Sequence, residues 1–188
     1  MKSNILEESQ SFHRNAVALL KKHRIIEHLQ KHGEVLLTGA FAANLMLSGD
    51  IDIYVLGNWD KPSVRIVFEQ LLDTVDIKSW QLFNWIKYRD PRFPKAWYIG
   101  LKDVFRGRKW KIDIWFLNKK QIESLPFAVW DSKSISDSDR LAILRFKKYR
   151  DQKKLEISSY RIYQAVLERG KKSIGEIQKY CGRFGDLV

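Results

Sequence analysis

The chain has 188 residues, 45% of them hydrophobic, which excludes a disordered protein and allows one well-packed domain with a small appended lobe. Its net charge of +12 favours polyanionic partners such as nucleotides or nucleic acid, although a solvated basic surface would explain the same charge. A single cysteine, Cys181, excludes an internal disulfide and a cysteine-based zinc site. Because residues 1–12 lack a signal-peptide core and the most apolar stretch, residues 35–47, is too short to span a membrane, we expect a cytoplasmic protein with no membrane partner.

The first third of the chain predicts two helices and two short strands. Apolar residues on a helical stripe predict one long helix over residues 5–32, which Gly33 ends. The sequence EVLLTG at residues 34–39 predicts a short buried strand, and the alanine-rich residues 40–47 predict a short helix. The sequence DIDIYVLG at residues 50–57 predicts a second strand.

The middle of the chain predicts a helix, a strand and a hairpin. Pro62 suits the first turn of a helix that runs to about residue 75. Residues 78–88 predict a further strand. Two strand-like segments, residues 97–105 and 109–117, flank Gly107 and predict a β-hairpin.

The composition changes after Asn118, and the rest of the chain predicts helices. Ser136 and Asp139 are typical of a capping box, which would open a helix that includes residues 138–154. Two shorter helices are predicted near residues 160–168 and 174–180.

Taken in order, these elements predict an α/β (α+β) fold, in which helices flank a mixed β-sheet and a helical lobe follows it. The division predicted from the sequence is a core of residues 1–120 and a C-terminal helical subdomain of residues 121–188.

Two acids, Asp50 and Asp52, lie in the most strand-like segment of this basic chain. Residues two apart in a strand project from the same face, about 6.5–7 Å apart, so two ionised carboxylates there repel each other. A third acid, Asp113, lies between isoleucines in the predicted hairpin. Acids also occur on the solvent-exposed face of antiparallel sheets, so an ordinary surface position remains an alternative explanation for these acids. If the strands are neighbours, however, three carboxylates could hold two Mg²⁺ ions, as in phosphoryl or nucleotidyl transfer.

The sequence LLTGAFAANLML before the acids predicts a strand, a tight turn and a helix. Gly39 permits close backbone approach, and the first free N–H groups of the following helix form an anion site. A triphosphate held there would lie near the acids if the two short strands pair.

These segments together resemble the superfamily of nucleotidyltransferases related to DNA polymerase β. The pattern is carried by Thr38–Ala40, by Asp50–Asp52 and by Ile112–Ile114, and the resemblance extends over residues 35–117. One departure is Ala40, where the superfamily commonly has serine or glycine, so one hydroxyl contact to phosphate is missing.

The resemblance implies a metal-dependent enzyme with an NTP substrate, for which we expect ATP. Asp50 and Asp52 would bind two Mg²⁺ ions, with Mn²⁺ as a substitute, and Asp113 would bind the catalytic ion and help to activate the acceptor hydroxyl. The residues expected to bind the nucleotide are Thr38, Gly39, Ala40, Lys147 and Lys148, with Lys111 and Arg108 as further cation candidates.

Three functions therefore stay open. The first is transfer of an NMP from an NTP to the hydroxyl or phosphate of a small molecule or RNA, by a two-metal mechanism. The second is a catalytically silent module of the same fold that binds nucleic acid or a protein, and the third is a toxin-like enzyme that modifies tRNA or a protein. The residues that could line an acceptor pocket, or equally belong to the core, are Trp80, Trp85, Trp97 and Tyr98.

Overall fold

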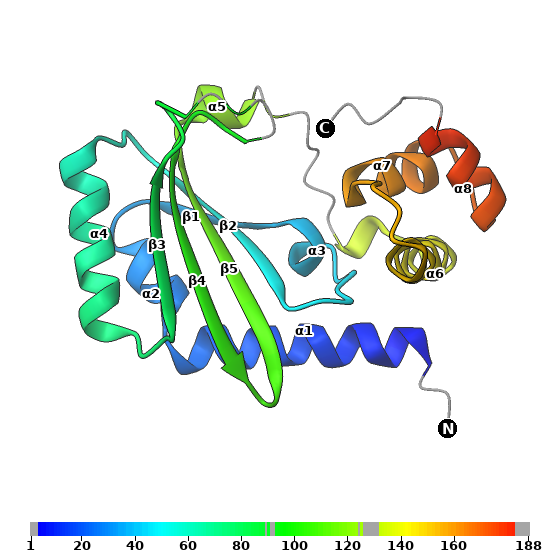
Figure 1. The fold of residues 1–188 in the computed structure, drawn as a ribbon, viewed down its shortest axis with the longest axis horizontal. Coiled ribbons are helices and arrows are strands. Elements are labelled where there is room, and N and C mark those ends of the chain that lie inside the picture. The colour runs from blue at the N-terminus through cyan, green and yellow to red at the C-terminus, as the bar shows by residue number, and fades with distance from the viewer. Residues whose placement is uncertain (1–3, 89, 91–92, 124, 126–131, 183–188) are drawn as a thin grey trace.

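A computed structural model describes residues 4–88, 90, 93–123, 125 and 132–182 of the chain. Its centre is a five-stranded mixed sheet in the order β1-β2-β5-β4-β3 (Figure 1). The strands are β1 (Glu34–Thr38), β2 (Asp50–Leu56), β3 (Ser79–Asn84), β4 (Trp97–Phe105) and β5 (Arg108–Leu117). Strands β2 and β5 pair in parallel, and the other neighbours pair antiparallel, so two strands far apart in sequence lie side by side.

Helices α1 (Ile5–Lys22), α2 (Ile25–Gln30) and α4 (Lys61–Thr74) pack on one face of the sheet, here called the core face. The buried side chains between these layers include Leu19, Leu29, Ile53, Val67 and Ile114. Alternation along β2 sends Ile51, Ile53 and Val55 to this face, so the residues between them project from the other face, here called the site face.

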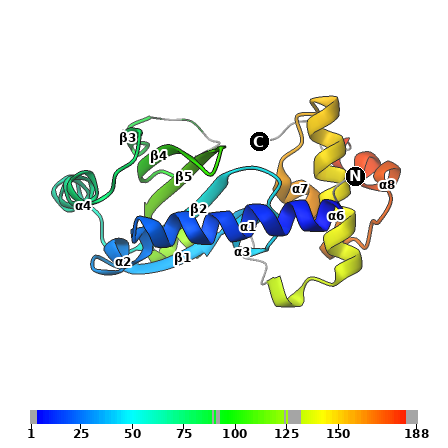
Figure 2. The ribbon, with the colours of Figure 1, turned by 90° about the horizontal axis from the view of Figure 1, so that it is seen from below.

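A group of helices follows the sheet and has its own apolar core. They are α5 (Lys119–Glu123), a 3₁₀ turn (Ser132–Ser134), α6 (Asp137–Lys153), α7 (Ser159–Tyr163), a π-helical turn (Gln164–Glu168) and α8 (Ile174–Cys181). The second core joins α6, α7 and α8 to Leu45, and Leu6 of α1 packs against it. Figure 2 shows α1 running beneath the sheet as far as α6. The predicted α/β class with a C-terminal helical lobe is confirmed.

The prediction of one helix over residues 5–32 is wrong. The chain leaves α1 at His23, and Arg24 adopts a left-handed backbone with φ 51° before α2 begins. This change of direction lets Ile25 and Leu29 pack against the sheet, where both are buried. A straight continuation of α1 would not place them there. The helix predicted over residues 40–47 is also too long.

That helix is α3 (Gly39–Ala42), and Asn44, with φ 54°, turns the chain away from it. The segment predicted as one helix near residues 160–168 is α7 followed by the π-helical turn. The hairpin at Gly107, with φ 73°, is confirmed, as is the N-cap of α6, where Ser136 Oγ accepts a hydrogen bond from the Asp139 backbone N–H. The Ser136 hydroxyl also donates to the Asp139 carboxylate.

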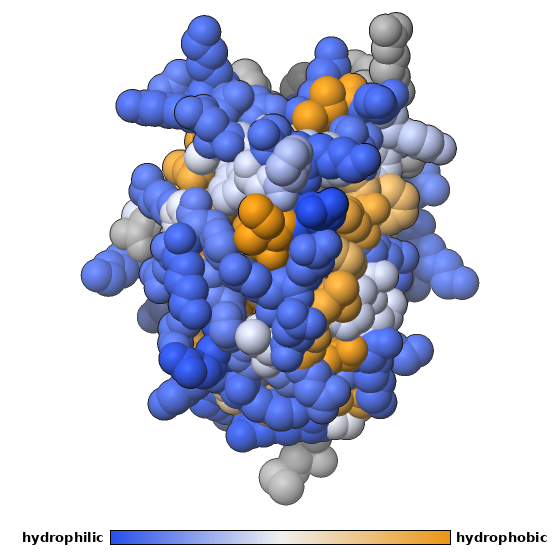
Figure 3. Space-filling view, turned by 90° about the vertical axis from the view of Figure 1, so that its left-hand side faces the viewer, coloured by the Kyte–Doolittle hydropathy of each residue, from blue (hydrophilic) through white to orange (hydrophobic). Residues whose placement is uncertain are grey.

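The surface on the α4 side of the molecule is mostly hydrophilic, with hydrophobic patches between the polar side chains (Figure 3). In the part of the chain that the structure describes, no helix combines the length and apolarity needed to cross a membrane.

Candidate active site

The three predicted acids lie together on the site face of the sheet. Asp52 of β2 is the register partner of Asp113 of β5, and Asp50 is the register partner of Lys111. Strand pairing places register partners in neighbouring positions on one face, so the parallel β2–β5 contact brings the two sequence segments into one constellation. The condition under which the three acids would converge, that their strands are neighbours in the sheet, is therefore met.

Gly39 lies directly against Asp52. Thr38, the last residue of β1, is the register partner of Asp52, and Gly39 follows it with φ +63°, a left-handed conformation that suits glycine. A Cβ atom on Gly39 would lie only 2.2 Å from Asp52 Oδ2. Both the backbone conformation and the space therefore require glycine where the resemblance places the motif glycine.

The environment of Asp52 disfavours its ionised form. Burial is the largest cause, the negative charges of Asp113 and Asp50 add to it, and together they raise the pKa of Asp52 to about 7. Lys111 and Lys147 lower this pKa but do not offset the increase. The ionised form of Asp52 is therefore disfavoured in the folded protein unless a further cation binds beside it.

Asp113 already has two polar partners. Lys111 Nζ lies 2.8 Å from Asp113 Oδ2, and the Tyr98 hydroxyl donates a 2.5 Å hydrogen bond to Oδ1. Burial, followed by the bond to Asp113, raises the pKa of Tyr98, so this phenol stays protonated and donating. Burial lowers the pKa of Lys111, but the bond and the charge of Asp113 outweigh that effect and raise it above its ordinary value.

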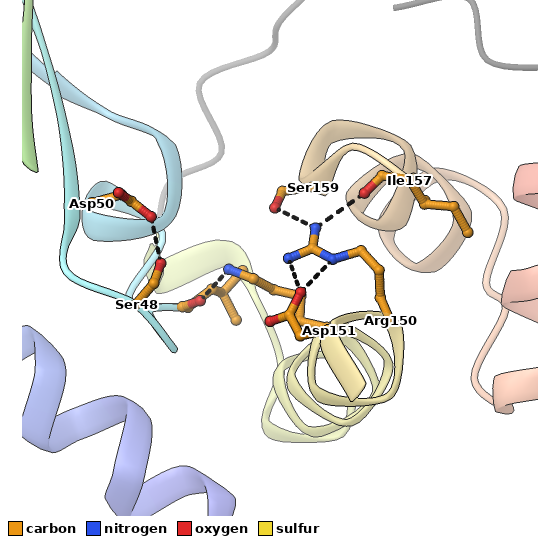
Figure 4. A network of polar contacts seen from close by, with 8 residues as sticks. Ser48, Asp50, Arg150, Asp151, Ile157 and Ser159 are labelled. Carbon is orange, nitrogen blue, oxygen red and sulfur yellow. Dashed lines mark hydrogen bonds and ion pairs between the residues drawn. The ribbon is translucent and has the colours of Figure 1, made fainter. Parts of the chain in front are cut away.

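A cavity of about 370 Å³ opens beside Asp50 and Asp52, between the site face and the helical lobe; we call it the interlobe cavity. Its lining residues come from both sides and include Thr38, Gly39, Ala40, Ser48, Tyr54, Lys147, Arg150, Ser159, Tyr160 and Tyr163. Figure 4 shows Ser48 and Asp50 on one side and Arg150 and Ser159 on the other. The Ser48 hydroxyl donates a 2.6 Å hydrogen bond to Asp50 Oδ2.

Two cations of α6 line this cavity. Lys147 is 4% exposed, and its Nζ donates a 2.7 Å hydrogen bond to the Leu45 carbonyl. Burial lowers the pKa of Lys147 to about 8. Arg150 is held by Asp151, by the Ile157 carbonyl and by the Ser159 hydroxyl.

Sequence reasoning missed Arg150. Its spacing of three residues from Lys147 places both side chains on one face of a helix, and this periodicity is the signal that could have found it. The hydrogen bonds that Arg150 donates to the Ser159 hydroxyl and to the Ile157 carbonyl reach acceptors beyond α6, and these have no local sequence signal.

The structure does not bring the other predicted cations to the interlobe cavity. Lys148 pairs with Glu8 of α1 at 2.7 Å, and it is not a lining residue. The Arg108 guanidinium lies over the Phe12 ring at 4.1 Å, against α1. Among the aromatic candidates, Tyr98 contacts Asp113, whereas Trp80 donates to the Ile77 carbonyl and packs against Phe68.

The donor chemistry of the site fits a divalent cation, but the side chains are not gathered around one. Among the described residues, no group of three or more His, Cys, Asp or Glu side chains is arranged to hold a metal ion. Asp50 and Asp52 offer hard oxygen ligands with uncompensated charge, which Mg²⁺ prefers. Asp113 would join them only by exchanging the Lys111 ammonium for the metal.

The chain has the nucleotidyltransferase fold. No protein-family model and no curated protein matches its sequence. Among solved structures it is similar to Cid1, described as having RNA terminal uridylyl transferase activity, with a TM-score of 0.58 and 17% identity over 84% of this chain and 46% of Cid1. It is also similar to two structures of GLD-2 complexes, both with a TM-score of 0.51 and 15% identity.

One of these is the complex of the non-canonical poly(A) polymerase GLD-2 with GLD-3, where the match covers all of this chain and 66% of that one. The other is the GLD-2/RNP-8 complex, with 98% and 68% covered. The chain thus spans about half the length of Cid1 and two thirds of GLD-2, and at these identities the similarity establishes the fold alone.

Proposed function

We propose that the protein is a metal-dependent nucleotidyltransferase that moves an NMP from an NTP to an acceptor hydroxyl or phosphate. The observation that carries the proposal is the register of β2 and β5, which sets Asp113 beside Asp52. Asp52 itself lines the interlobe cavity together with Gly39 and Lys147. A structural role is a poor explanation for this placement, because burial first, and then the charges of Asp113 and Asp50, raise the pKa of Asp52 and disfavour its ionised form.

In the proposed reaction, an acceptor oxygen forms a bond to the α-phosphorus while the bond to the bridging oxygen of the β-phosphate breaks, and pyrophosphate leaves. Asp50, Asp52 and Asp113 would hold two Mg²⁺ ions, or Mn²⁺ in their place, which supply positive charge that offsets the phosphates. Asp113, which accepts hydrogen bonds on both oxygens, would orient the acceptor hydroxyl and accept its proton.

The interlobe cavity is the proposed site of the NTP, with ATP as the expected nucleotide. Thr38, Gly39 and Ala40 line the floor next to the acids, and Lys147 and Arg150 supply positive charge from the opposite wall. Positioning and charge neutralisation in a partly dry cavity are the main sources of catalysis in nucleotidyl transfer. The similarity to enzymes that act on RNA supports RNA as an acceptor beside a small molecule.

The proposal is tested by calorimetric titration with a non-hydrolysable ATP analogue, in Mg²⁺ and in EDTA. We expect metal-dependent binding that the Asp50→Asn/Asp52→Asn variant loses, with the variant still folded by circular dichroism. An affinity for the ATP analogue that neither EDTA nor the two substitutions change would contradict the proposal. Labelled NTP, offered with tRNA, protein and small-molecule acceptors, then separates a toxin-like activity from the others.

A matched pair of lysines tests the cation assignment. Lys147→Met is expected to weaken binding of the ATP analogue at least about tenfold, because it removes a charge from the cavity wall. Lys148→Met removes the same charge one residue away, outside the cavity, and should change affinity less than about twofold. Equal losses in the two variants would show that the effect comes from the net charge of α6 and not from the cavity.

A catalytically silent module is the second candidate, and the Lys111–Asp113 ion pair favours it. In a silent protein this pair would be permanent, and Mg²⁺ would not compete with the ammonium. The Lys111→Met variant distinguishes the two functions: it should increase the Mg²⁺-dependence of nucleotide binding in an enzyme, and should change nothing in a silent module.

A further inference from the structure

A second cavity lies on the open part of the site face, on the far side of Asp50 from the helical lobe. Its volume is about 360 Å³, and four of its ten lining residues are lysines. They are Lys78, Lys102, Lys109 and Lys111. We call it the lysine cavity. Of its lining residues only Asp50 also lines the interlobe cavity, so the two cavities meet at Asp50.

Strand register explains why the lysines converge. Lys111 of β5 has Asp50 as its partner on one side and Lys102 of β4 on the other, and Lys102 in turn faces Ser79 of β3. Lys109 lies two residues before Lys111 and therefore projects from the same face. Lys78 directly precedes β3 and closes the row. The residue before β3, one residue of β4 and two residues of β5 thus supply one basic surface next to Asp50.

The positive charge of this cavity is largely unpaired. Within the described residues, Lys111 has an acidic partner in Asp113, but Lys78, Lys102 and Lys109 have no carboxylate within salt-bridge distance. The only other acid besides Asp50 in the lining is Asp103, and its carboxylate points away to buried His23, at 3.8 Å. Like charges held together without partners repel, so the row favours an anionic ligand.

An aromatic row runs parallel to the lysines on the other side of Asp113. Trp115, Tyr98 and Phe83 are consecutive register partners on β5, β4 and β3. Their rings lie close together, with centroids 4.8 Å apart for Tyr98 and Trp115 and 6.2 Å apart for Phe83 and Tyr98, and Phe83 is 43% exposed. Tyr98 and Trp115 are only 7% and 8% exposed, so the open face of β3–β5 offers cations, then an acid, then the exposed ring of Phe83.

We propose that this open face binds the end of a single-stranded nucleic acid as acceptor, with the lysine cavity holding its backbone phosphates. The inference rests on the proposed nucleotidyl transfer and names its acceptor class. Cations that follow a backbone, combined with an exposed aromatic ring on which bases stack, are the chemistry that binds single strands without sequence preference. A terminal hydroxyl between the two rows would meet Asp113, opposite the NTP in the interlobe cavity.

The test is fluorescence anisotropy with a short labelled single-stranded RNA, in EDTA, at salt concentrations from about 50 to 200 mM. The variant Lys78→Ala/Lys102→Ala/Lys109→Ala should bind at least about tenfold more weakly, with a shallower dependence on salt, because three phosphate contacts are lost. Lys111 is left intact, since it contacts Asp113. The control Lys61→Ala/Lys119→Ala/Lys120→Ala removes three exposed lysines beyond the opposite ends of β2 and β5, and should lose less than about twofold.

Several outcomes would overturn the inference: no binding of the RNA by the wild type, equal losses in the two triple variants, or duplex RNA bound as tightly as the single strand. Titration of the same variants with the ATP analogue and Mg²⁺ keeps the two proposals apart. If nucleotide binding persists while RNA binding is insensitive to the lysines, the acceptor assignment alone fails. If nucleotide binding is absent from the wild type, the proposed enzyme fails whatever the RNA result.

Discussion

The Asp52→Asn variant is expected to be more stable than the wild type at pH 8 without metal, and to lose nucleotidyl transfer by roughly 1,000-fold. The pKa of Asp52 rises from 3.8 to about 7, mainly because the group is buried and then because Asp113 and Asp50 are negative. An acid whose pKa is higher in the folded state binds a proton more tightly there. The contribution of Asp52 to the free energy of unfolding therefore falls as the pH rises from about 4 to 7 and stays low above that range. Asparagine removes this loss, which we place at about 2 kcal/mol after allowing for partial exposure to solvent.

Urea unfolding at several pH values between 4 and 8, in EDTA, measures this effect. The difference in free energy of unfolding between the variant and the wild type should grow with pH up to about 7 and then level off. Asp73→Asn, an exposed acid of α4, is the control and should show no such trend. A variant less stable than the wild type at every pH would mean that the Asp52 carboxylate holds the fold together and is not in conflict with it.

Gly39→Ala is expected to reduce nucleotidyl transfer at least about 100-fold and to destabilise the protein by about 2–3 kcal/mol. Two separate effects contribute. The left-handed backbone at φ +63° disfavours any Cβ by about 1–2 kcal/mol, and that Cβ would lie 2.2 Å from Asp52 Oδ2. Because the contacted atom belongs to a side chain, Asp52 must turn away, which moves it out of the constellation with Asp113.

Gly170→Ala separates the two effects. Gly170 has nearly the same backbone, with φ +64°, but a Cβ there meets no atom within 4 Å. The extra destabilisation of Gly39→Ala over Gly170→Ala, measured by urea unfolding, reports the contact with Asp52. In an Asp52→Ala background this extra destabilisation should disappear. If it persists, the Cβ of residue 39 collides with something other than the carboxylate.

Local sequence patterns were sufficient to predict the strands that carry the acids. Alternation in DIDIYVLG predicts that Asp50 and Asp52 share a face opposite Ile51 and Ile53, and the burial of the isoleucines agrees. The hairpin at Gly107 was also predictable, because a short turn and its two strands are contiguous. Parallel pairing of β2 with β5 was not predictable from local patterns, because it joins segments about sixty residues apart. From the residues alone, the proximity of Asp113 to Asp50 and Asp52 was conditional on that pairing, and the resemblance then supported it.

The charged partners around the acids had no local signal. The Lys111–Asp113 ion pair and the Tyr98 hydroxyl depend on rotamers and on the β4–β5 register, which an amino-acid pattern does not specify. Lys147 and Lys148 are adjacent in sequence and look equivalent. Successive side chains on a helix nevertheless point about 100° apart, so Lys147 lines the interlobe cavity and Lys148 pairs with Glu8.

Helix α1 sets a dimension of the interlobe cavity that no lining residue controls. Its 18 residues span about 27 Å, with Leu19 in the core of the sheet and Leu6 in the core of the helical lobe. Because α1 packs in both cores, it fixes the distance between the two walls of the cavity. The Glu8–Lys148 ion pair links its N-terminal end to α6. Loosening that end would change the width of the interlobe cavity without altering any of its lining residues.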